Sequence, residues 1–495
     1  MSKLNDKDLL VIEQKYEKDK DGQYFQVDVL KALMIFLVIF DHIVGWSVKS
    51  YIGVTLWERI SIPIFLIVMG FNMGLSFQRK NDLTLRELYS WHYFKSKIIR
   101  YIVPFLILYA ASTFIGLFMY GFDISAMYHG QYYPQHGFIQ LFFGILPFWG
   151  PGNWFIPLLF QSILIMPLLY RAFKKKPILT LIICFAAEIT MQLTVFYFIG
   201  EITSWQEVHY INIFMNSILF YLSAVGLGIW FSFGYKLEDN RNFFMWFLYP
   251  ISLAFIVVYQ FFSYRIMVGD VPLLRGDYHF LIFPYSAFLF LLAMKLIPQT
   301  SEGPLSRSIK LISKSTYHIL LTQILGYGMI FAFWGTHYAI DVLVTIPLDR
   351  YETIELLEAL LNLISAWILF ISFGILWYKI DQNKNLYRRI LYYLNFFIVF
   401  ASILFLMFWV QEAWVPITLV IIIVYAVIAL ITTYIIKKPL KTKILSLWTL
   451  FLLMTFVMMI LQVQVFQSNE SWIPLIIVAA FLLIAVVGTI LDYRS

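Results

Sequence analysis

Apolar segments long enough to cross a lipid bilayer recur along nearly the whole chain of 495 residues. A bilayer core about 30 Å thick needs roughly 20 apolar residues of helix. Inside lipid every backbone polar group must be hydrogen-bonded within the segment, so such runs form helices. The sequence therefore predicts an all-α fold, a polytopic transmembrane helix bundle of about 14 spans. The predicted spans are 28–48, 57–77, 98–121, 154–171, 177–199, 211–234, 243–263, 279–297, 311–334, 355–379, 390–410, 415–436, 444–466 and 472–491.

The composition excludes a soluble globular protein. Hydrophobic residues make up 61% of the chain and charged residues only 13%, whereas soluble domains carry about 25% charged residues. The single cysteine, Cys184, excludes an intrachain disulfide framework and a thiolate zinc site. No zinc motif, Walker loop, dinucleotide fingerprint or GxSxG elbow occurs. We therefore expect no metal.

Basic residues alternate between the predicted loops. They are dense in the N-terminal tail, in the loop between the second and third spans, and in every second loop after that. Because cytoplasmic loops are enriched in Lys and Arg, both termini are predicted to be cytoplasmic. This distribution also explains the formal net charge of +7 without a nucleic-acid partner. With a polar N-terminus and no cleavage site, we expect a multi-pass protein of the cell membrane that keeps its first span.

The chain divides into three predicted parts. Residues 1–24 form a polar cytoplasmic tail, residues 25–380 a ten-span domain, and residues 381–495 an appended four-helix membrane block. Docking of a partner and homodimerisation both stay open as roles of this block. The long outer loop near 122–152 is predicted not to span, because its apolar stretch is too short.

The first predicted helix carries ionisable residues within an apolar run. His42 lies eleven positions after Lys31, which is about 16 Å along a helix and brings both to within about 20° of one face. Asp41 points about 100° away from His42 and is expected to find a partner on another helix. Intramembrane ionisable residues are costly and usually mark a functional site. The stripe thus places a cation near the cytoplasm and an imidazole toward the outer half.

Two interpretations of this stripe stay open. A cation near the inner surface can hold a phosphate-bearing donor such as acyl-CoA, and a histidine further out can take a proton from a hydroxyl. Alternatively, Lys31 reaches the interface with its ammonium group and His42 makes one interhelical hydrogen bond.

Several segments resemble the acyltransferase-3 family of membrane O-acyltransferases. Lys31 and His42 resemble the family's basic residue, ten intervening residues and histidine, and Ser61–Phe71 is similar to its second-helix run. Lys97–Pro104 resembles the basic start of the third helix. Asn153–Ile156 with Pro167, and Ser315–Gln323, are similar to two later segments. The resemblance covers about residues 25–380.

The resemblance implies transfer of an acyl group, expected to be acetyl, from cytoplasmic acyl-CoA to a hydroxyl of an extracytoplasmic glycan or lipid-linked sugar. His42 would be the general base, supported by Asp41. The donor acetyl-CoA would lie near Lys31, Lys97 and Arg100. The predicted substrate-binding residues are Arg59, Trp154 and Gln323.

The chain departs from the family pattern at three positions. Lys31 stands where Arg is usual, Gln323 where His is common, and Leu159 where many members carry Glu. A lysine keeps the charge but lacks the planar fork that binds phosphate.

Two other classes of protein stay open on the sequence alone. An exporter of lipid-linked oligosaccharides also has twelve or fourteen spans, although we find no convincing internal repeat. A non-catalytic sensor or scaffold is compatible as well, since a shared fold does not establish activity. Glu188 and His318 are predicted to be structural residues that pair or pack within the bundle.

Overall fold

The computed structural model describes residues 24–44, 49, 53–79, 84–119, 152, 154–199, 216–262, 266–269, 271–274, 278–334 and 353–384, and single residues between 386 and 400. Its elements are α2 (Phe25–Ile43), α4 (Val54–Trp57), α5 (Ser61–Gln78), α6 (Leu85–Leu88), α7 (Trp91–Lys97), η1 (Ile98–Ile102), α8 (Val103–Met119), α11 (Phe155–Lys175), α12 (Pro177–Ile199), η2 (Ile218–Tyr221), α14 (Leu222–Ser232), η3 (Asn240–Asn242), α15 (Met245–Phe262), β1 (Met267–Val268), β2 (Val271–Pro272), α16 (Phe283–Leu296), α17 (Pro304–Trp334) and α19 (Thr353–Asp381). The two short strands pair antiparallel.

The structure confirms a mostly helical protein of the membrane type. Each of the ten predicted runs between residues 28 and 379 overlaps a helix of the described residues. Within the described residues, five helices are long and apolar enough to cross a membrane by length and composition. Apolar side chains such as Ile178 and Ile182 are more than half exposed on α12, as expected of a surface facing lipid. The total number of spans and the orientation of the termini stay predictions.

Three predicted regions lie outside the described residues. They are the tail before residue 24, most of the outer loop near 122–152, and the chain beyond residue 400, which holds almost the whole appended block.

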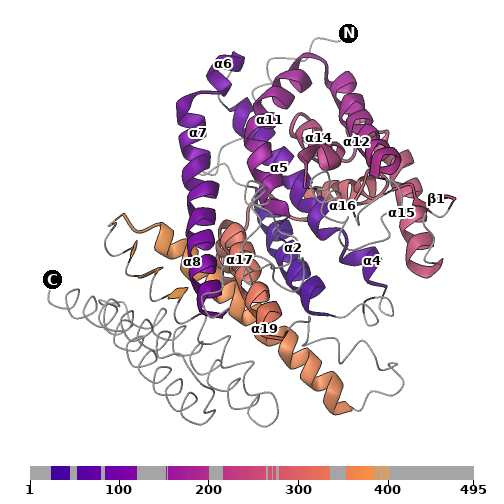
Figure 1. Ribbon diagram of the computed structural model, residues 1–495. Helices are drawn as coiled ribbons and strands as arrows, with labels where there is room; N and C mark the ends of the chain where they lie inside the picture. Colours follow the sequence, from indigo (N-terminus) through magenta and orange to yellow (C-terminus); the bar gives the residue numbers. More distant parts are fainter. Residues whose placement is uncertain are drawn as a thin grey trace, which may run out of the picture.

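Helices α5 and α14 pack with their backbones in close approach. A Cβ atom at Gly70 would lie 2.2 Å from the Val225 carbonyl oxygen, and one at Gly228 would lie 2.1 Å from that of Ile67. Both positions therefore require glycine. Small residues at a helix crossing let backbones approach, which is how helices associate when lipid supplies no hydrophobic drive. Figure 1 shows α5 beside α14, with α2 on the other side of α5.

Helix α2 occupies the centre of the bundle, packed against α5 on one side and α17 on the other (Figure 1). One apolar core gathers around α5, α14 and α16. A second gathers around the C-terminal half of α2, α17 and α19. The Tyr327 hydroxyl of α17 donates to the Ile39 carbonyl at 3.1 Å, and Trp367 Nε1 of α19 donates to the Phe36 carbonyl at 3.0 Å. These bonds fix the depth of α2 relative to its neighbours.

The third predicted span contains a π-helical turn, η1, between α7 and α8. The Val103 N–H donates to the Ile98 carbonyl, five residues earlier. Pro104 follows directly and has no N–H to continue the regular ladder, which accounts for the irregularity at this point. Single π turns widen a helix locally and often occur at functional sites. Here the turn contains Arg100 and begins directly after Lys97.

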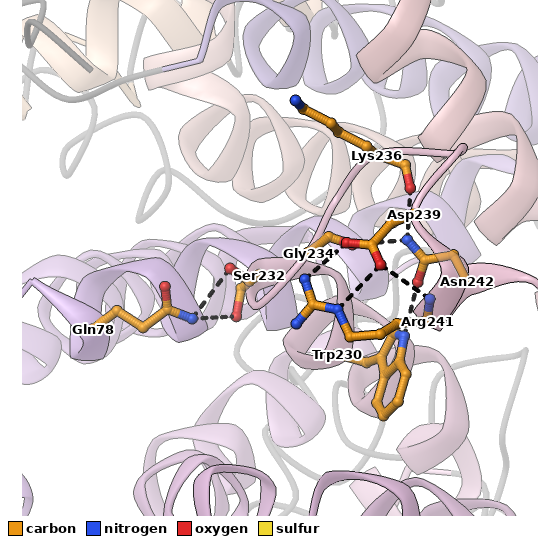
Figure 2. Close-up of polar contacts among 8 residues, drawn as sticks. All are labelled: Gln78, Trp230, Ser232, Gly234, Lys236, Asp239, Arg241 and Asn242. Carbon is orange, nitrogen blue, oxygen red and sulfur yellow. Dashed lines mark hydrogen bonds and ion pairs between the residues drawn. The ribbon is translucent and has the colours of Figure 1, made fainter. Parts of the chain in front are cut away.

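A compact polar turn joins α14 to α15 and is drawn in Figure 2. The Asn242 side chain donates to the carbonyls of Gly234 and Lys236, each at 2.7 Å, and accepts from Trp230 Nε1 at 2.8 Å. Arg241 Nη2 lies 2.8 Å from Asp239 Oδ2. The turn satisfies its own polar groups at the end of the helix, so we regard it as structural.

Candidate functional site

One cavity of about 980 Å³ runs beside α2 and is walled by α5, α11, α17 and the π turn. Its lining includes six residues predicted to form the site, namely Lys31, Asp41, His42, Lys97, Arg100 and Trp154. Since α2 continues unbroken from Phe25 to Ile43, Lys31 and His42 lie about 16 Å apart along its axis. A single cavity therefore reaches both ends of the predicted stripe.

The end of the cavity near Lys31 is rich in cations. The lining cations are Lys31, Arg79, Lys97, Arg100, Lys314 and Arg389. Each comes from the part of its helix or loop that the basic-loop pattern predicts to be near the cytoplasm. Lys97 Nζ lies within 6 Å of the ring centroids of Tyr93 and Tyr101, and the Arg100 guanidinium lies 5.4 Å from that of Tyr101. Aromatic faces thus hold the cations of the π turn.

Lys31 is anchored to the facing helix. Its Nζ donates to the Ser313 carbonyl of α17 at 2.6 Å, while the Ser313 hydroxyl donates to Asp28 Oδ1 at 2.5 Å. An ammonium group carries three donors, so the bond to Ser313 leaves capacity for an anion in the cavity. This geometry joins α2 to α17 at the level of Lys31.

His42 lies at the opposite end, near the last turn of α2. Its ring contacts Tyr327 edge to face, with centroids 5.7 Å apart. A Cβ atom at Gly152 would lie 3.8 Å from His42 Nε2. Gly152 has a φ of +91°, which favours glycine. No residue in the described part of the chain makes a hydrogen bond to Nε2, and His42 lines the cavity.

Asp41 is held mainly by Lys49, which follows α2 in the chain. Lys49 Nζ lies 2.5 Å from Asp41 Oδ1 and also donates to the Asp41 carbonyl oxygen. The nearest atoms of Asp41 and His42, Oδ2 and Nδ1, are 3.8 Å apart. That separation is too long for a hydrogen bond but close enough for electrostatic support of an imidazolium. The partner of Asp41 thus comes from the segment after α2, where sequence reasoning expected another helix.

Trp154 forms an aromatic wall together with two tyrosines. Its ring stacks on Tyr221, with centroids 5.4 Å apart, and on Tyr278, at 6.2 Å. Trp154 and Tyr278 both line the cavity, and the Phe155 N–H donates to the Gly152 carbonyl at 3.2 Å. The bend at Gly152 therefore places the wall close to His42.

Arg59 and Gln323 are absent from the cavity lining. The Arg59 guanidinium lies 4.9 Å from the Tyr259 ring centroid, and the side chain is buried. Its neighbour Glu58 lines the cavity and accepts from the Ser61 hydroxyl at 3.2 Å. Gln323 is fully buried in α17, and its amide atoms have no hydrogen-bond partner among the described residues.

The sequence predicted a structural role for two buried ionisable residues, Glu188 and His318. Glu188 accepts from the hydroxyl and the N–H of Ser223 on α14, so it pairs with a neighbouring helix, as predicted. His318, predicted to be a packing residue, lines the cavity. Its Nε2 lies 2.7 Å from Asp381 Oδ2. The sequence did contain a signal for His318, because an ionisable residue within an apolar helix is a candidate for function.

The described residues include no group of three or more His, Cys, Asp or Glu side chains that could hold a metal ion. The lining instead combines cations, an accessible imidazole and aromatic faces. Such a set can bind an anion at one end, accept a proton at the other and stack on a flat or cyclic acceptor.

Comparison with known proteins identifies the family. The family model of the acyltransferase-3 group, described as an acyltransferase domain, matches residues 24–377. No curated protein and no solved structure matches the chain. The matched residues cover more than half of the chain. They include every residue that lines the cavity except Tyr378, Asp381, Gln382 and Arg389.

Proposed function

The chain belongs to the acyltransferase-3 family, and we propose that it moves an acyl group from cytoplasmic acyl-CoA to a hydroxyl of an extracytoplasmic glycan or lipid-linked sugar. The expected acyl group is acetyl. The observation that carries the proposal is the single cavity that joins the cation-lined end at Lys31 to the imidazole of His42. A donor made on one side of the membrane can then meet an acceptor on the other.

The donor is held at the basic end. Phosphate groups bind Lys and Arg side chains through charge-assisted hydrogen bonds, and Lys31, Lys97 and Arg100 supply these donors. The Lys31 ammonium acts as a point charge and lacks the two parallel N–H donors that a guanidinium offers to phosphate. Several cations therefore bind the phosphate groups together. The arm of the donor then runs along α2 for about 16 Å to bring its thioester near His42.

Chemistry takes place beside His42. Its Nε2 accepts the proton of the acceptor hydroxyl, and the oxygen attacks the thioester carbonyl carbon. The C–S bond breaks as the tetrahedral intermediate collapses, and the proton passes from the imidazolium to the CoA thiolate. Asp41 stabilises the imidazolium electrostatically from 3.8 Å. Trp154 and Tyr278 offer aromatic faces to the sugar ring, and Glu58 offers a carboxylate to its hydroxyls.

The experiment follows labelled acetyl groups from acetyl-CoA into glycans or lipids in proteoliposomes. We expect label with the wild type and with His92→Ala, because His92 is exposed on α7 and absent from the cavity lining. We expect none with His42→Ala at matched expression. Equal labelling with His42→Ala would remove His42 from the mechanism. Movement of lipid-linked sugars without labelling would favour an exporter.

A further inference from the structure

His318 on α17 is bonded at one nitrogen and unpartnered at the other. Its Nε2 lies 2.7 Å from Asp381 Oδ2, and Asp381 Oδ1 accepts from the Tyr393 hydroxyl. Its Nδ1 is buried and has no hydrogen-bond partner among the described residues. A buried polar atom without a partner costs about 1–3 kcal/mol, so this arrangement calls for a ligand or another explanation.

The imidazole is also part of the cavity wall. Its side chain is only 9% exposed, yet it lines the cavity together with Tyr378 and Asp381 of α19. The rings of Tyr317, Trp377 and Tyr378 surround it, with centroids within 6.1 Å. The Asp381 bond and these rings fix the orientation of the imidazole, as a preorganised binding group requires.

The register of α17 gives the level of His318 within the cavity. Ser313, five residues earlier, is bonded to Lys31, and Tyr327, nine residues later, contacts His42. At about 1.5 Å per residue, His318 lies about 7.5 Å from Ser313 and about 13.5 Å from Tyr327 along the axis of α17. It therefore lies between the contact to Lys31 and the contact to His42 on this helix.

Two other cavity-lining side chains of α17 at this level are bonded within the protein. The Tyr317 hydroxyl donates to the Tyr101 carbonyl at 2.7 Å, and the Thr316 hydroxyl donates to the Ser313 carbonyl at 2.8 Å. Ser315 and Gln323 of the same helix also have buried polar atoms without a partner among the described residues, but neither residue lines the cavity. His318 therefore combines an unpartnered buried nitrogen with a place in the cavity wall.

We propose that His318, oriented by Asp381 and Tyr393, is a binding residue for the arm of the acyl-CoA donor, where its free ring nitrogen hydrogen-bonds an amide of the arm. This inference rests on the proposed function. The arm carries amide groups between the phosphates and the thioester, and each offers both an N–H and a carbonyl. A neutral Nδ1 accepts from the former and a protonated Nδ1 donates to the latter.

Two substitutions separate binding from a structural role. In His318→Gln the amide nitrogen can occupy the place of Nε2 and keep the bond to Asp381, while the nitrogen at the δ position is lost. In His318→Asn a polar atom stays near the δ position, but the bond to Asp381 is lost. A purely structural role therefore predicts that the Gln variant behaves as wild type and that the Asn variant loses thermal stability.

The measurement uses the full-length protein in nanodiscs, with CoA binding and KM for acetyl-CoA as readouts. We expect His318→Gln to keep the wild-type melting temperature, weaken CoA binding about tenfold and raise KM for acetyl-CoA about tenfold, with KM for the acceptor unchanged. With a short acetyl thioester that lacks the amide arm, wild type and variant should react alike.

Unchanged CoA binding by His318→Gln would overturn the inference. It would leave the proposed function standing if the wild type transfers acetyl groups. If the wild type transfers no acetyl group, the proposed function fails, whereas CoA binding still reports separately on His318.

Discussion

The two ends of the cavity are built differently. Near Lys31, six cations from α2, the end of α5, α7, the π turn, α17 and the segment after α19 line the wall. Near His42, one imidazole lies between a glycine bend and an aromatic wall. Holding a phosphate group needs charge, which several side chains can share, whereas proton transfer needs one atom at one place. The comparison predicts that the end at His42 is more sensitive to single changes than the end at Lys31.

Replacement of His42 by Ala should have the largest effect. A positioned general base contributes roughly 10²–10⁴-fold to a rate, so we expect kcat for acyl transfer to fall about 1,000-fold. CoA binding should stay within about twofold of wild type, because the cations lie about 16 Å away along α2. Kinetics and CoA binding measured on the same preparation check both statements. A loss of CoA binding would show that the two ends are not independent.

Replacement of Lys31 by Met should weaken donor binding rather than chemistry. Hydrogen bonds to charged groups contribute about 1.5–3 kcal/mol, so KM for the donor should rise about tenfold or more while kcat is kept. Lys31→Arg should restore the affinity, since guanidinium suits phosphate. Ser313→Ala is the matched control, because it removes the hydroxyl bonded to Asp28 and keeps the carbonyl that accepts from Lys31. A fall in kcat alone would contradict the assignment.

Replacement of Trp154 by Leu should affect the acceptor and not the donor. Aromatic stacking is worth about 0.5–1.5 kcal/mol beyond area burial, so KM for the acceptor should rise about three- to tenfold. Trp154→Phe, which keeps an aromatic face, should lie between wild type and Leu. If KM for acetyl-CoA rises instead, the aromatic wall belongs to the donor path.

Replacement of Arg100 by Ala should have a smaller effect than replacement of His42 or Lys31. Arg100 shares the basic end with five other cations, and it is exposed at the π turn. We expect KM for acetyl-CoA to rise about two- to threefold, as for the loss of one screened charge pair. The double variant of Arg100→Ala with Lys97→Ala should exceed the sum of the two single effects, because the remaining cations no longer compensate.

Much of the fold could be predicted from the sequence, because the bilayer leaves few choices to an apolar segment. Runs of about 20 apolar residues must form helices there, and each of the ten predicted runs up to residue 379 overlaps one. The sequence also predicted that Lys31 and His42 lie on one face of the helix, since eleven residues are close to three helical turns. Both residues line the same cavity.

Contacts between distant segments could not be predicted in this way. His318 and Asp381 are 63 residues apart, and no local periodicity relates them. The roles of Glu58 and Arg59 depend on the break between α4 and α5, which directs the first to the cavity and the second to Tyr259. Neighbouring residues point about 100° apart on a helix, so a small change at a break decides which of them lines a site.

The smallest effect is expected far from the cavity, at Asp239 in the turn of Figure 2. The hydrogen bond from Arg241 holds the pKa of Asp239 below its ordinary value. A lowered pKa in the folded state stabilises the protein above the ordinary pKa near 3.8, and this stabilisation is lost as the pH falls through the folded value. Because Arg241 is exposed to solvent and Asp239 is partly exposed, Asp239→Asn should cost less than about 1 kcal/mol at pH 7. Thermal melts of both proteins should begin to converge as the pH falls below about 4, and acyl transfer should be unchanged. A loss of transfer would mean that this turn, and not only the two ends of the cavity, controls the reaction.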